Sequence, residues 1–533
     1  MERRNILIGG AWPYANSSLH LGHIAGLISG DVLARYFRLK GDNVLYVSGS
    51  DTHGTPITER ARKENKDPQE IAEYYDAEFR RMFDGLQFSY DLYSRTFEDY
   101  HKEKVQQLFR RLYDNGYIYE KLENQAYCEK CGKFLSDREV VLTCPECGEE
   151  TKGDQCDKCL HVPTGEELLK GNCIVCGSKI VERENKVLYL ALSKFQKQIE
   201  EHTKKVNHEW RVNAQNETDK YLKQGLLDRA VTRDLSWGVK IPVDGYDDKR
   251  MYVWIDAVLG YLTDTMRLCE DRTDCTWEDF WKEGHNNKIY MCHGKDNIVF
   301  HSIILNALLL GQEDNYHLVD TIVSAEYLNY NDQKFSKSKG IGMTALEALD
   351  IYDSDSLRYH LIANGPEKKD TNFTIEDFEN THNGEMVNKF GNLVNRTLKF
   401  KGLEEIPNGT LDPEIEKAIK ETYVKTGELV EKLEFREAVR TIMELVELGN
   451  KYYDEKQPWI AKKENEEEFN NIIYTCSTII LNLSNLYAFV IPTACDKLRS
   501  YFKVEKPCWE IIYPEKGLKL ENIEPLFTRY EKK

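Results

Sequence analysis

Two short segments carry side chains suited to binding a triphosphate. The tetrad HLGH occupies residues 20–23, where it follows a loop of small residues and begins a helical pattern of apolar positions. Free backbone N–H groups at a helix N-terminus favour anions, so His20 and His23 are placed to contact phosphate. The pentad KFSKS at residues 334–338 adds two ammonium groups beside small hydroxyl groups. Together these groups suit the neutralisation of charge that develops when a carboxylate displaces pyrophosphate from ATP.

Four short apolar runs each precede a loop that carries polar residues of this kind. Ligands of an open parallel sheet bind beyond the carboxyl ends of its strands, so the four loops can share one crevice. The sequence therefore predicts an α/β fold with a Rossmann-like parallel sheet. The runs are residues 6–8 before Tyr14, 44–47 before Asp51, 289–291 before residues 293–295, and 322–323 before the lysine pentad.

Eight of the 14 cysteines form four Cys-x-x-Cys pairs between the two segments. Two such pairs can supply four thiolates to one tetrahedral Zn²⁺, which predicts one or two structural zinc ions with no open coordination position. Spacing alone leaves sequential, crossed and nested pairings open. The other six cysteines are scattered, as free thiols of a reducing compartment would be. The pairs are Cys128/Cys131, Cys144/Cys147, Cys156/Cys159 and Cys173/Cys176.

Length and charge limit the classes of protein to consider. At 533 residues the chain is too long for one ordinary core, and about 150 residues per domain suggests three or four units. Its 72 basic and 90 acidic side chains give a net charge of −18, so RNA binding would rely on local clusters of Lys and Arg. No apolar run approaches the roughly 20 residues of a spanning helix, and the N-terminal run is too short for a signal peptide. We therefore expect a cytoplasmic protein without a membrane partner.

The order HLGH then KFSKS resembles the HIGH and KMSKS signatures of class I aminoacyl-tRNA synthetases, with Leu21 and Phe335 as conservative departures. The finer resemblance is to the methionyl-tRNA synthetase family, and it extends over nearly the whole chain. It rests on the four cysteine pairs and on AWPYAN at residues 11–16, GSDTHGTP at 49–56, YVWIDA at 252–257, and GKD at 294–296 with His301.

The resemblance implies an ATP-dependent ligase that joins methionine to initiator and elongator tRNA(Met), with Mg²⁺ accompanying ATP. It implies that the catalytic residues are His20, His23, Lys334 and Lys337. The residues implied to bind ATP are His20, Gly22, His23, Gly294, Lys295, Asp296 and Lys337. Those implied to bind methionine are Ala11, Trp12, Tyr14, Asp51, Trp254, Ala257, Tyr261 and His301, with Asp51 pairing the α-ammonium group.

These roles make chemical sense for a methionine site. A thioether is flexible and polarisable and gains from aromatic contacts. A carboxylate such as that of Asp51 is costly in an apolar crevice unless a cation meets it. Without the resemblance, core packing would be the commoner role of each aromatic residue. Val258 and Asn297 stand where the family usually has a proline and an aliphatic residue, which affects only the edges of the implied pocket.

The resemblance also implies a domain plan. It implies a catalytic domain at residues 1–116 and 230–330, interrupted by a cysteine-bearing insertion at 117–229, then a pentad and helical stem-contact region at 331–385 and a helical anticodon-binding domain at 386–533. The chain is expected to return to strand-like sheet near Trp254. Nested zinc ligation is favoured, with Cys144, Cys147, Cys156 and Cys159 on one ion and Cys128, Cys131, Cys173 and Cys176 on the other. Asn392, Arg396 and Trp459 are implied to read the CAU anticodon.

Two alternative functions deserve comparison. A class I enzyme for leucine, isoleucine or valine usually carries a large editing insertion, whereas the insertion here consists mostly of cysteine pairs. A zinc-knuckle RNA-binding protein without catalysis would have no need for Asp51, His20, His23 and Lys337. Because no oligonucleotide-binding barrel is appended, we expect a monomer.

Overall fold

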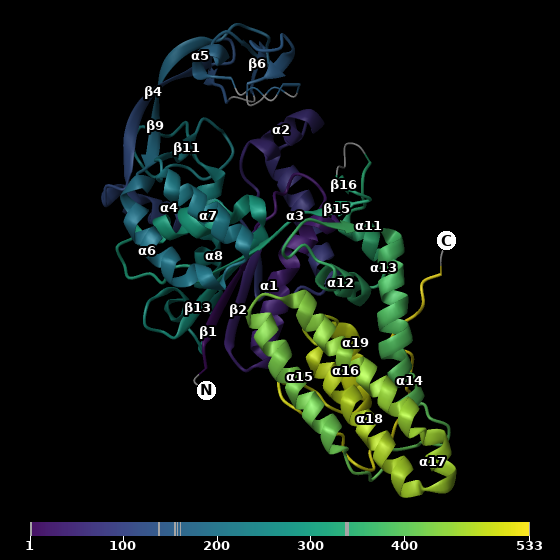
Figure 1. Ribbon diagram of the computed structural model, residues 1–533. Helices are drawn as coiled ribbons and strands as arrows, with labels where there is room; N and C mark the ends of the chain where they lie inside the picture. Colours follow the sequence, from purple (N-terminus) through teal and green to yellow (C-terminus); the bar gives the residue numbers. More distant parts are fainter. Residues whose placement is uncertain are drawn as a thin grey trace.

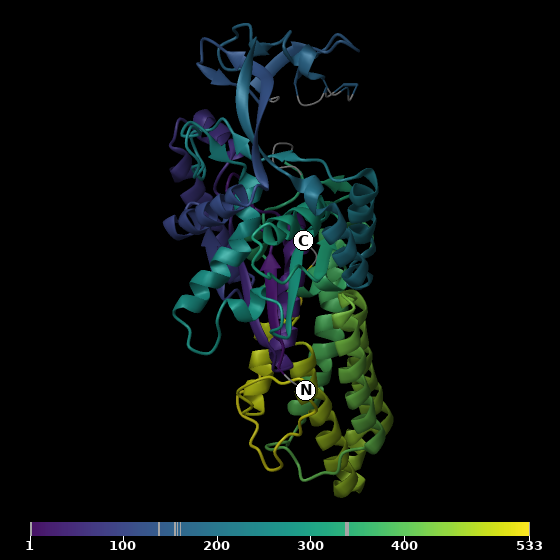
Figure 2. The same cartoon turned by 90° about the vertical axis from the view of Figure 1, so that its left-hand side faces the viewer.

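The molecule has three parts arranged along one long axis (Figures 1 and 2). A slender strand ribbon lies at one end, an α/β body in the middle and a helical bundle at the other end. The computed structural model describes residues 3–136, 139–153, 156, 158–159, 161, 163–335 and 340–531. Among these residues, no helix combines the length and the apolar character needed to span a bilayer.

A five-stranded parallel sheet forms the centre of the body. In spatial order its strands are β14 (Thr321–Ala325), β13 (Asn287–Gly294), β1 (Asn5–Gly10), β2 (Asn43–Ser50) and β3 (Leu92–Arg95). In β1, Ile6 lies opposite Lys288 on one side and Val44 on the other. The chain order reverses between β1 and β13, and the ligand crevice of a doubly wound sheet lies at such a point. The predicted Rossmann-like sheet is confirmed.

Helices cover both faces of this sheet (Figure 1). The helix α1 (Leu21–Leu39) follows β1 and packs against the middle of the sheet. A Cβ at Gly30 would lie 2.7 Å from the hydroxyl of Tyr46 on β2, so this glycine lets α1 lie close to the strand. The other helices of the body are α2 (Thr55–Glu64), α3 (Pro68–Gly85), α4 (Asp99–Asp114), α6 (Gln196–Val206), α7 (Val212–Gln224), α8 (Val253–Glu270), α9 (Glu278–Trp281) and α10 (Leu305–Leu310).

The expectation of strand-like sheet near Trp254 is wrong, because this residue lies in the helix α8. The segment around it is apolar on nearly every side, and such a pattern fits a fully buried helix as well as a strand. Most of α8 is indeed buried against the sheet and α4. The sheet resumes only with β13, after α8 and α9.

A long antiparallel ribbon carries the cysteine pairs away from the body (Figure 2). Its two strands are β4 (Ile118–Cys128) and β9 (Val181–Leu190), paired from Ile118 and Leu190 to Tyr127 and Val181. The hydrophobic core of its tip is small. Short elements fill this tip: β5 (Lys133–Phe134), β6 (Val140–Thr143), β7 (Glu150–Lys152), α5 (Gly165–Leu168) and β8 (Asn172–Cys173).

Short strands and helices connect the body to the bundle. The predicted helical connection after the lysine pentad is confirmed by α11 (Ala345–Leu349) and α12 (Ser354–Ala363). The other elements of this region are β15 (Leu328–Tyr330), β16 (Gln333–Lys334), β17 (Thr371–Phe373) and α13 (Ile375–Thr381). Three further short strands lie near the ribbon: β10 (Arg229–Ala230), β11 (Thr232–Arg233) and β12 (Arg250–Met251).

The bundle buries the apolar stripes that the sequence places on two of its helices. Ala438, Ile442 and Leu445 of one helix are buried, as are Cys476 and Ile480 of the other. The helices are α14 (Asn392–Leu398), α15 (Pro413–Glu431), α16 (Phe435–Lys456), α17 (Pro458–Glu464), α18 (Glu466–Leu486) and α19 (Pro492–Tyr501).

A fully buried ion pair joins the bundle to the body. Arg358 of α12 and Asp31 of α1 are each 0 % exposed, and Arg358 Nη2 lies 2.6 Å from Asp31 Oδ2. The guanidinium also donates to the backbone carbonyls of Leu86, Phe489 and Val490. One side chain therefore links the helix that carries HLGH to the turn between α18 and α19.

Candidate active site

HLGH and the first two residues of the pentad, Lys334 and Phe335, lie side by side at the carboxyl end of the parallel sheet. His20 precedes α1, and its ring stacks on Phe335 with centroids 4.4 Å apart and planes 5° apart. On the far side of the pentad, Thr344 forms a β-bridge with His20, and the Ala345 N–H donates to the carbonyl of Leu19 at 2.9 Å. Segments more than three hundred residues apart in the chain are thus held together by stacking and backbone hydrogen bonds. The pentad residues 336–338, including Lys337, lie outside the described residues.

Hydrogen bonding fixes the tautomer of His23. The backbone N–H of His20 donates to His23 Nδ1 at 3.1 Å, so neutral His23 carries its proton on Nε2. Burial lowers the pKa of His20 to about 3, and desolvation in the cleft also lowers the pKa of His23. Near neutral pH both rings are uncharged N–H donors, and an approaching phosphate would favour their cationic forms.

A cleft of about 410 Å³ opens between the ends of β1 and β13, where the reversal of strand order predicts it. It unites most of the predicted nucleotide residues with Lys334 and Phe335 of the pentad. Asn297, which differs from the residue usual in the family, also lines the cleft. Val258, the other such difference, is buried in the core. The predicted residues in its wall are Ala11, Trp12, His20, Gly22, His23, Gly294, Asp296 and Lys334.

Lys295 lies beside this cleft and is held by two acids. Its Nζ is 2.7 Å from Glu326 Oε2 and 3.0 Å from Asp370 Oδ1, and it lies over the ring of Tyr327. The Tyr327 hydroxyl in turn donates to Asp296 Oδ1 at 2.5 Å. The sequence analysis did not include Glu326 and Tyr327, although both directly follow β14, the last strand of the parallel sheet in chain order.

A group of aromatic side chains lies outside the lining of this cleft and contacts it through Trp12, whose ring meets that of Tyr261. Tyr14 and Trp254 meet edge to face with ring centroids 5.7 Å apart. Trp254 also stacks on Phe300 of the π-helical turn η5 (Phe300–Ile304), with centroids 4.4 Å apart. Phe300 was not predicted. These half-buried rings offer flat apolar faces to a thioether.

His301 and Tyr261 form a buried hydrogen-bonded pair next to these rings. His301 Nδ1–H donates to the carbonyl of Asn297 at 2.8 Å, so Nε2 carries a lone pair and accepts from the Tyr261 hydroxyl at 2.8 Å. Burial lowers the pKa of His301 to about 4, so the ring is neutral near pH 7. Trp12 meets the Tyr261 ring edge to face, and Ala257 is buried on the same helix as Tyr261.

Asp51 lies at the end of β2 with almost no exposed surface. Its backbone N–H donates to the carbonyl of Pro13, and its own carbonyl accepts from Ala15, which fixes it against the loop after β1. Its carboxylate accepts one hydrogen bond, from the backbone N–H of His53 at 3.2 Å. Burial and the charge of Asp256 raise the pKa of Asp51 well above its usual range.

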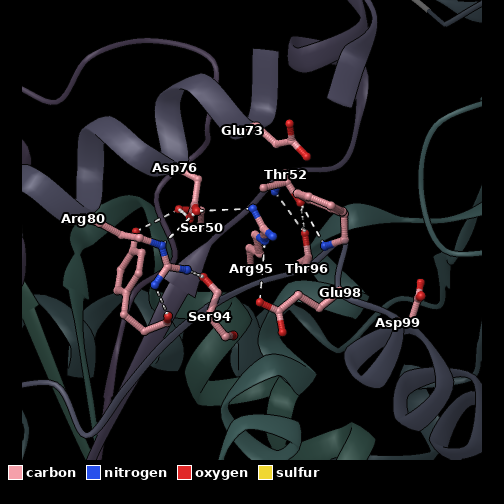
Figure 3. Close-up of polar contacts among 12 residues, drawn as sticks. Ser50, Thr52, Glu73, Asp76, Arg80, Ser94, Arg95, Thr96, Glu98 and Asp99 are labelled. Atoms are coloured by element: carbon pink, nitrogen blue, oxygen red, sulfur yellow. Dashed lines mark hydrogen bonds and ion pairs between the residues drawn. The ribbon is translucent and has the colours of Figure 1, made fainter. Parts of the chain in front are cut away.

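Polar contacts from Thr96, which directly follows β3, and from α3 fix the loop on either side of Asp51 (Figure 3). The Thr52 backbone N–H donates to Thr96 Oγ1 at 3.0 Å, and the two threonine hydroxyls lie 2.9 Å apart. On the other side, the Ser50 hydroxyl donates to Asp76, which also pairs with Arg80 of the same helix at 2.9 Å. Asp51 is therefore positioned before any substrate arrives.

The eight paired cysteines form two compact groups at the tip of the ribbon. In each group, the Sγ atoms of the four cysteines all lie within 4.8 Å of one another. Four thiolates at such spacing suit tetrahedral zinc. The groups are Cys128, Cys131, Cys173 and Cys176, and Cys144, Cys147, Cys156 and Cys159, which is the nested pairing.

The three predicted anticodon residues lie on adjoining helices at the far end of the bundle. Arg396 pairs with Asp454 at 2.7 Å and lies over the Tyr453 ring, which is 6.1 Å from the ring of Trp459. Asn392 lies one turn before Arg396 on α14. Trp459 is 45 % exposed, so its face is free to stack on a base.

Comparison with known proteins assigns the family. A family model described as class I tRNA synthetases (M) matches residues 6–398, and one described as the anticodon binding domain of methionyl tRNA ligase matches residues 406–523. The chain belongs to the methionine group of class I tRNA synthetases. Methionine–tRNA ligase 1 of Alkaliphilus oremlandii is 45 % identical to this synthetase over 532 residues, covering 99 % of this chain and 98 % of that relative. A methionine–tRNA ligase of Bacillus mycoides is 45 % identical over 538 residues, covering 99 % of this chain and 97 % of that relative.

The fold of this synthetase is also found in a solved structure. Mycobacterium tuberculosis methionyl-tRNA synthetase, solved in complex with methionyl-adenylate, superposes with a TM-score of 0.80 over 99 % of this chain and 100 % of that one, at 22 % identity. Because the family match includes both the catalytic and the anticodon-binding parts, it confirms the predicted family. It rejects the alternatives of a leucine, isoleucine or valine enzyme and of a non-catalytic RNA-binding protein.

Proposed function

We propose that the protein is a methionine–tRNA ligase whose crevice makes methionyl-adenylate from methionine and ATP and then transfers the methionyl group to the 3′ end of tRNA(Met). The proposal rests on one observation: HLGH and Lys334 line one cleft at the reversal point of the sheet, and Trp12 and Pro13 of its wall lead into Tyr14, which forms a β-bridge with the buried Asp51. Family membership supports the same reaction.

In the first step, the thioether packs among Tyr14, Trp254 and Tyr261 while Asp51 pairs the α-ammonium group. The methionine carboxylate is then directed at the nucleotide side of the cleft. One carboxylate oxygen bonds to the α-phosphorus, the bond from this phosphorus to the β-phosphate oxygen breaks, and pyrophosphate leaves. No side-chain nucleophile is needed, so the protein acts by positioning and by stabilising charge.

His20 and His23 supply the fixed donors for the phosphates. The Nε2–H of His23 and the N-terminus of α1 favour the developing negative charge. Lys334, together with the predicted Lys337, adds ammonium groups from the pentad. Mg²⁺ enters with ATP as part of the substrate and shares in neutralising the phosphates.

In the second step, a ribose hydroxyl of the terminal nucleotide attacks the carbonyl carbon of the adenylate, and AMP leaves. Asn392 and Arg396 lie on α14 and Trp459 lies on α17, helices of the bundle (Figure 1), where they would contact the anticodon. Arg396 would exchange Asp454 for a base or phosphate. We propose initiator and elongator tRNA(Met) as partners of a cytoplasmic monomer.

The two groups of four cysteines would each hold one Zn²⁺ in the tip of the ribbon. With every coordination position taken by thiolate, the ions supply no chemistry to the reaction. They would instead stabilise a tip whose apolar core is too small to fold firmly by itself.

ATP–pyrophosphate exchange with a panel of amino acids tests this function. We expect methionine to support exchange with kcat/KM at least roughly a hundredfold above leucine, isoleucine and valine. Asp51→Asn should abolish most of the exchange with every amino acid, because the α-ammonium group is common to all of them, whereas Asp99→Asn, an exposed carboxylate at the start of α4, should leave the exchange unchanged. Equal exchange with leucine and methionine would refute the proposal.

A further inference from the structure

Two carboxylates lie buried next to His53, beyond the end of β2. Asp51 is 1 % exposed and Asp256, in the first turn of α8, is 0 % exposed. His53 contacts both, because its backbone N–H donates to Asp51 Oδ1 at 3.2 Å and its Nδ1 lies 2.9 Å from Asp256 Oδ2. The two acids therefore form one electrostatic unit. Asp256 was not among the predicted site residues, although it lies inside the segment YVWIDA.

This unit has no strong cation of its own. Among the described residues, no Lys or Arg forms an ion pair with either acid, and the His53 imidazole is the one basic group that contacts Asp256. Burial lowers the pKa of His53 to about 3, so the imidazole is neutral at physiological pH. Asp256 Oδ1 is buried without a hydrogen-bond partner in the described part of the chain.

Two adjacent carboxylates in such a site cannot both ionise without a compensating charge. Burial raises the pKa of each well above its usual range, and the charge of Asp256 raises that of Asp51 further. Burial raises the pKa values of Tyr14 and Tyr252 and lowers that of His101, so these three neighbours are uncharged. The charge of Lys102 helps to keep His53 neutral. The other titratable groups that face the unit are Tyr14, Tyr252, Tyr261, His101 and Lys102; burial also raises the pKa of Tyr261, which is therefore uncharged.

We propose that Asp51 and Asp256 share one proton in the empty site, and that this proton leaves for solvent when the ammonium group of the substrate enters. The empty unit holds one proton and one negative charge. The filled unit holds two carboxylates and one ammonium group; the O–H bond of the shared acid breaks, and the buffer base binds the released proton. Asp256 is thereby a second acidic group of the ammonium site, and the inference rests on methionine being the substrate.

Proton release gives a readout that a merely structural role of Asp256 would not produce. Titration calorimetry of methionine binding in two buffers of different ionisation enthalpy measures the number of protons released. We expect the wild-type protein to release close to one proton below the raised pKa values, and its affinity for methionine to rise up to about tenfold per pH unit in that window. The methionine analogue that lacks the amino group should release none.

Two matched variants separate the shared proton from other effects. Asp256→Asn keeps the side-chain size but leaves Asp51 without its acidic neighbour, so proton release near neutral pH should fall to less than about half. Asp264→Asn removes another buried carboxylate of α8, which accepts a hydrogen bond from Ser94 at 2.6 Å, and should leave the release unchanged.

The outcomes distinguish this inference from the proposed function. If methionine does not bind at all, the proposed function fails. If methionine binds without proton release across the neutral and mildly acidic range, or if Asp256→Asn releases as many protons as wild type, the shared proton is excluded. Should Asp256→Asn fail to fold, as judged by circular dichroism, the wild-type pH dependence and the comparison with the amino-free analogue decide the question.

Discussion

Gly22→Ala should reduce adenylation while leaving the fold intact. A Cβ at residue 22 would lie 3.0 Å from the His20 ring and 3.2 Å from the Phe335 ring. These distances are a few tenths of an ångström shorter than ordinary contacts, so one of the stacked rings must shift. Since a misplacement of about 1 Å at a reacting centre can cost a hundredfold, we expect kcat to fall by roughly tenfold. The KM for methionine should hardly change, because Tyr14, Trp254 and Tyr261, which are proposed to hold the thioether, do not line the cleft that contains Gly22.

The same substitution should not lower stability much. Alanine is favoured over glycine in a helix by up to about 1 kcal/mol, which offsets part of the crowding cost of about 1–3 kcal/mol. Pyrophosphate exchange gives kcat, and thermal unfolding gives Tm. The matched control is Gly384→Ala, a helical glycine whose added Cβ would meet nothing within 4 Å. Wild-type kcat in Gly22→Ala would refute the idea that stacking between HLGH and the pentad positions His20.

Three further perturbations test other parts of the molecule. Arg358→Met should lower the free energy of unfolding by about 3–5 kcal/mol, measured by urea denaturation, because it removes the fully buried cation paired with Asp31 and the donor to three backbone carbonyls. Arg35→Met, at a partly exposed partner of Asp31, should cost under about 1 kcal/mol. The folded-state pKa of Asp31 lies below its unfolded value near 3.8. The stabilisation by the Arg358–Asp31 pair is therefore present above pH 3.8 and declines as the pH falls towards the folded-state pKa. A urea midpoint that does not change in acid would contradict the pairing. Removal of metal with a strong chelator should increase proteolysis of the ribbon tip and reduce tRNA charging more than pyrophosphate exchange; equal loss of both would show that the metal supports the whole fold. Trp459→Ala should reduce kcat/KM for tRNA charging by at least about tenfold while sparing exchange, and unchanged charging would exclude an anticodon role.

The sequence predicts those features that depend on local pattern. Apolar runs before polar loops predict the parallel sheet, because ligand-binding loops of such a sheet follow its strands. The HLGH segment before an apolar helical stripe predicts the N-terminus of α1. Family resemblance adds the nested cysteine groups, which the structure confirms, and the residue roles around Asp51 and Trp459, which stay predictions.

Features that depend on contacts between distant segments were not predictable in this way. The stacking of Phe335 on His20 needs the return of residues 340–345 to the start of α1. The carboxylate of Asp256 reaches His53 only because α8 is a helix. The sequence of α8 is apolar on nearly every side, so its pattern does not distinguish a helix from a strand. Lys295 shows the same limit, since its two acidic partners come from residues after β14 and before β17.

A crystal structure with a non-hydrolysable sulfamoyl analogue of methionyl-adenylate tests the central claim most directly. We predict electron density in which the phosphate-mimicking group lies against His20 and His23, the ammonium group lies against Asp51, and the sulfur lies among Tyr14, Trp254 and Tyr261. Density at any other surface, or an analogue bound with its ammonium group away from Asp51, would contradict the account.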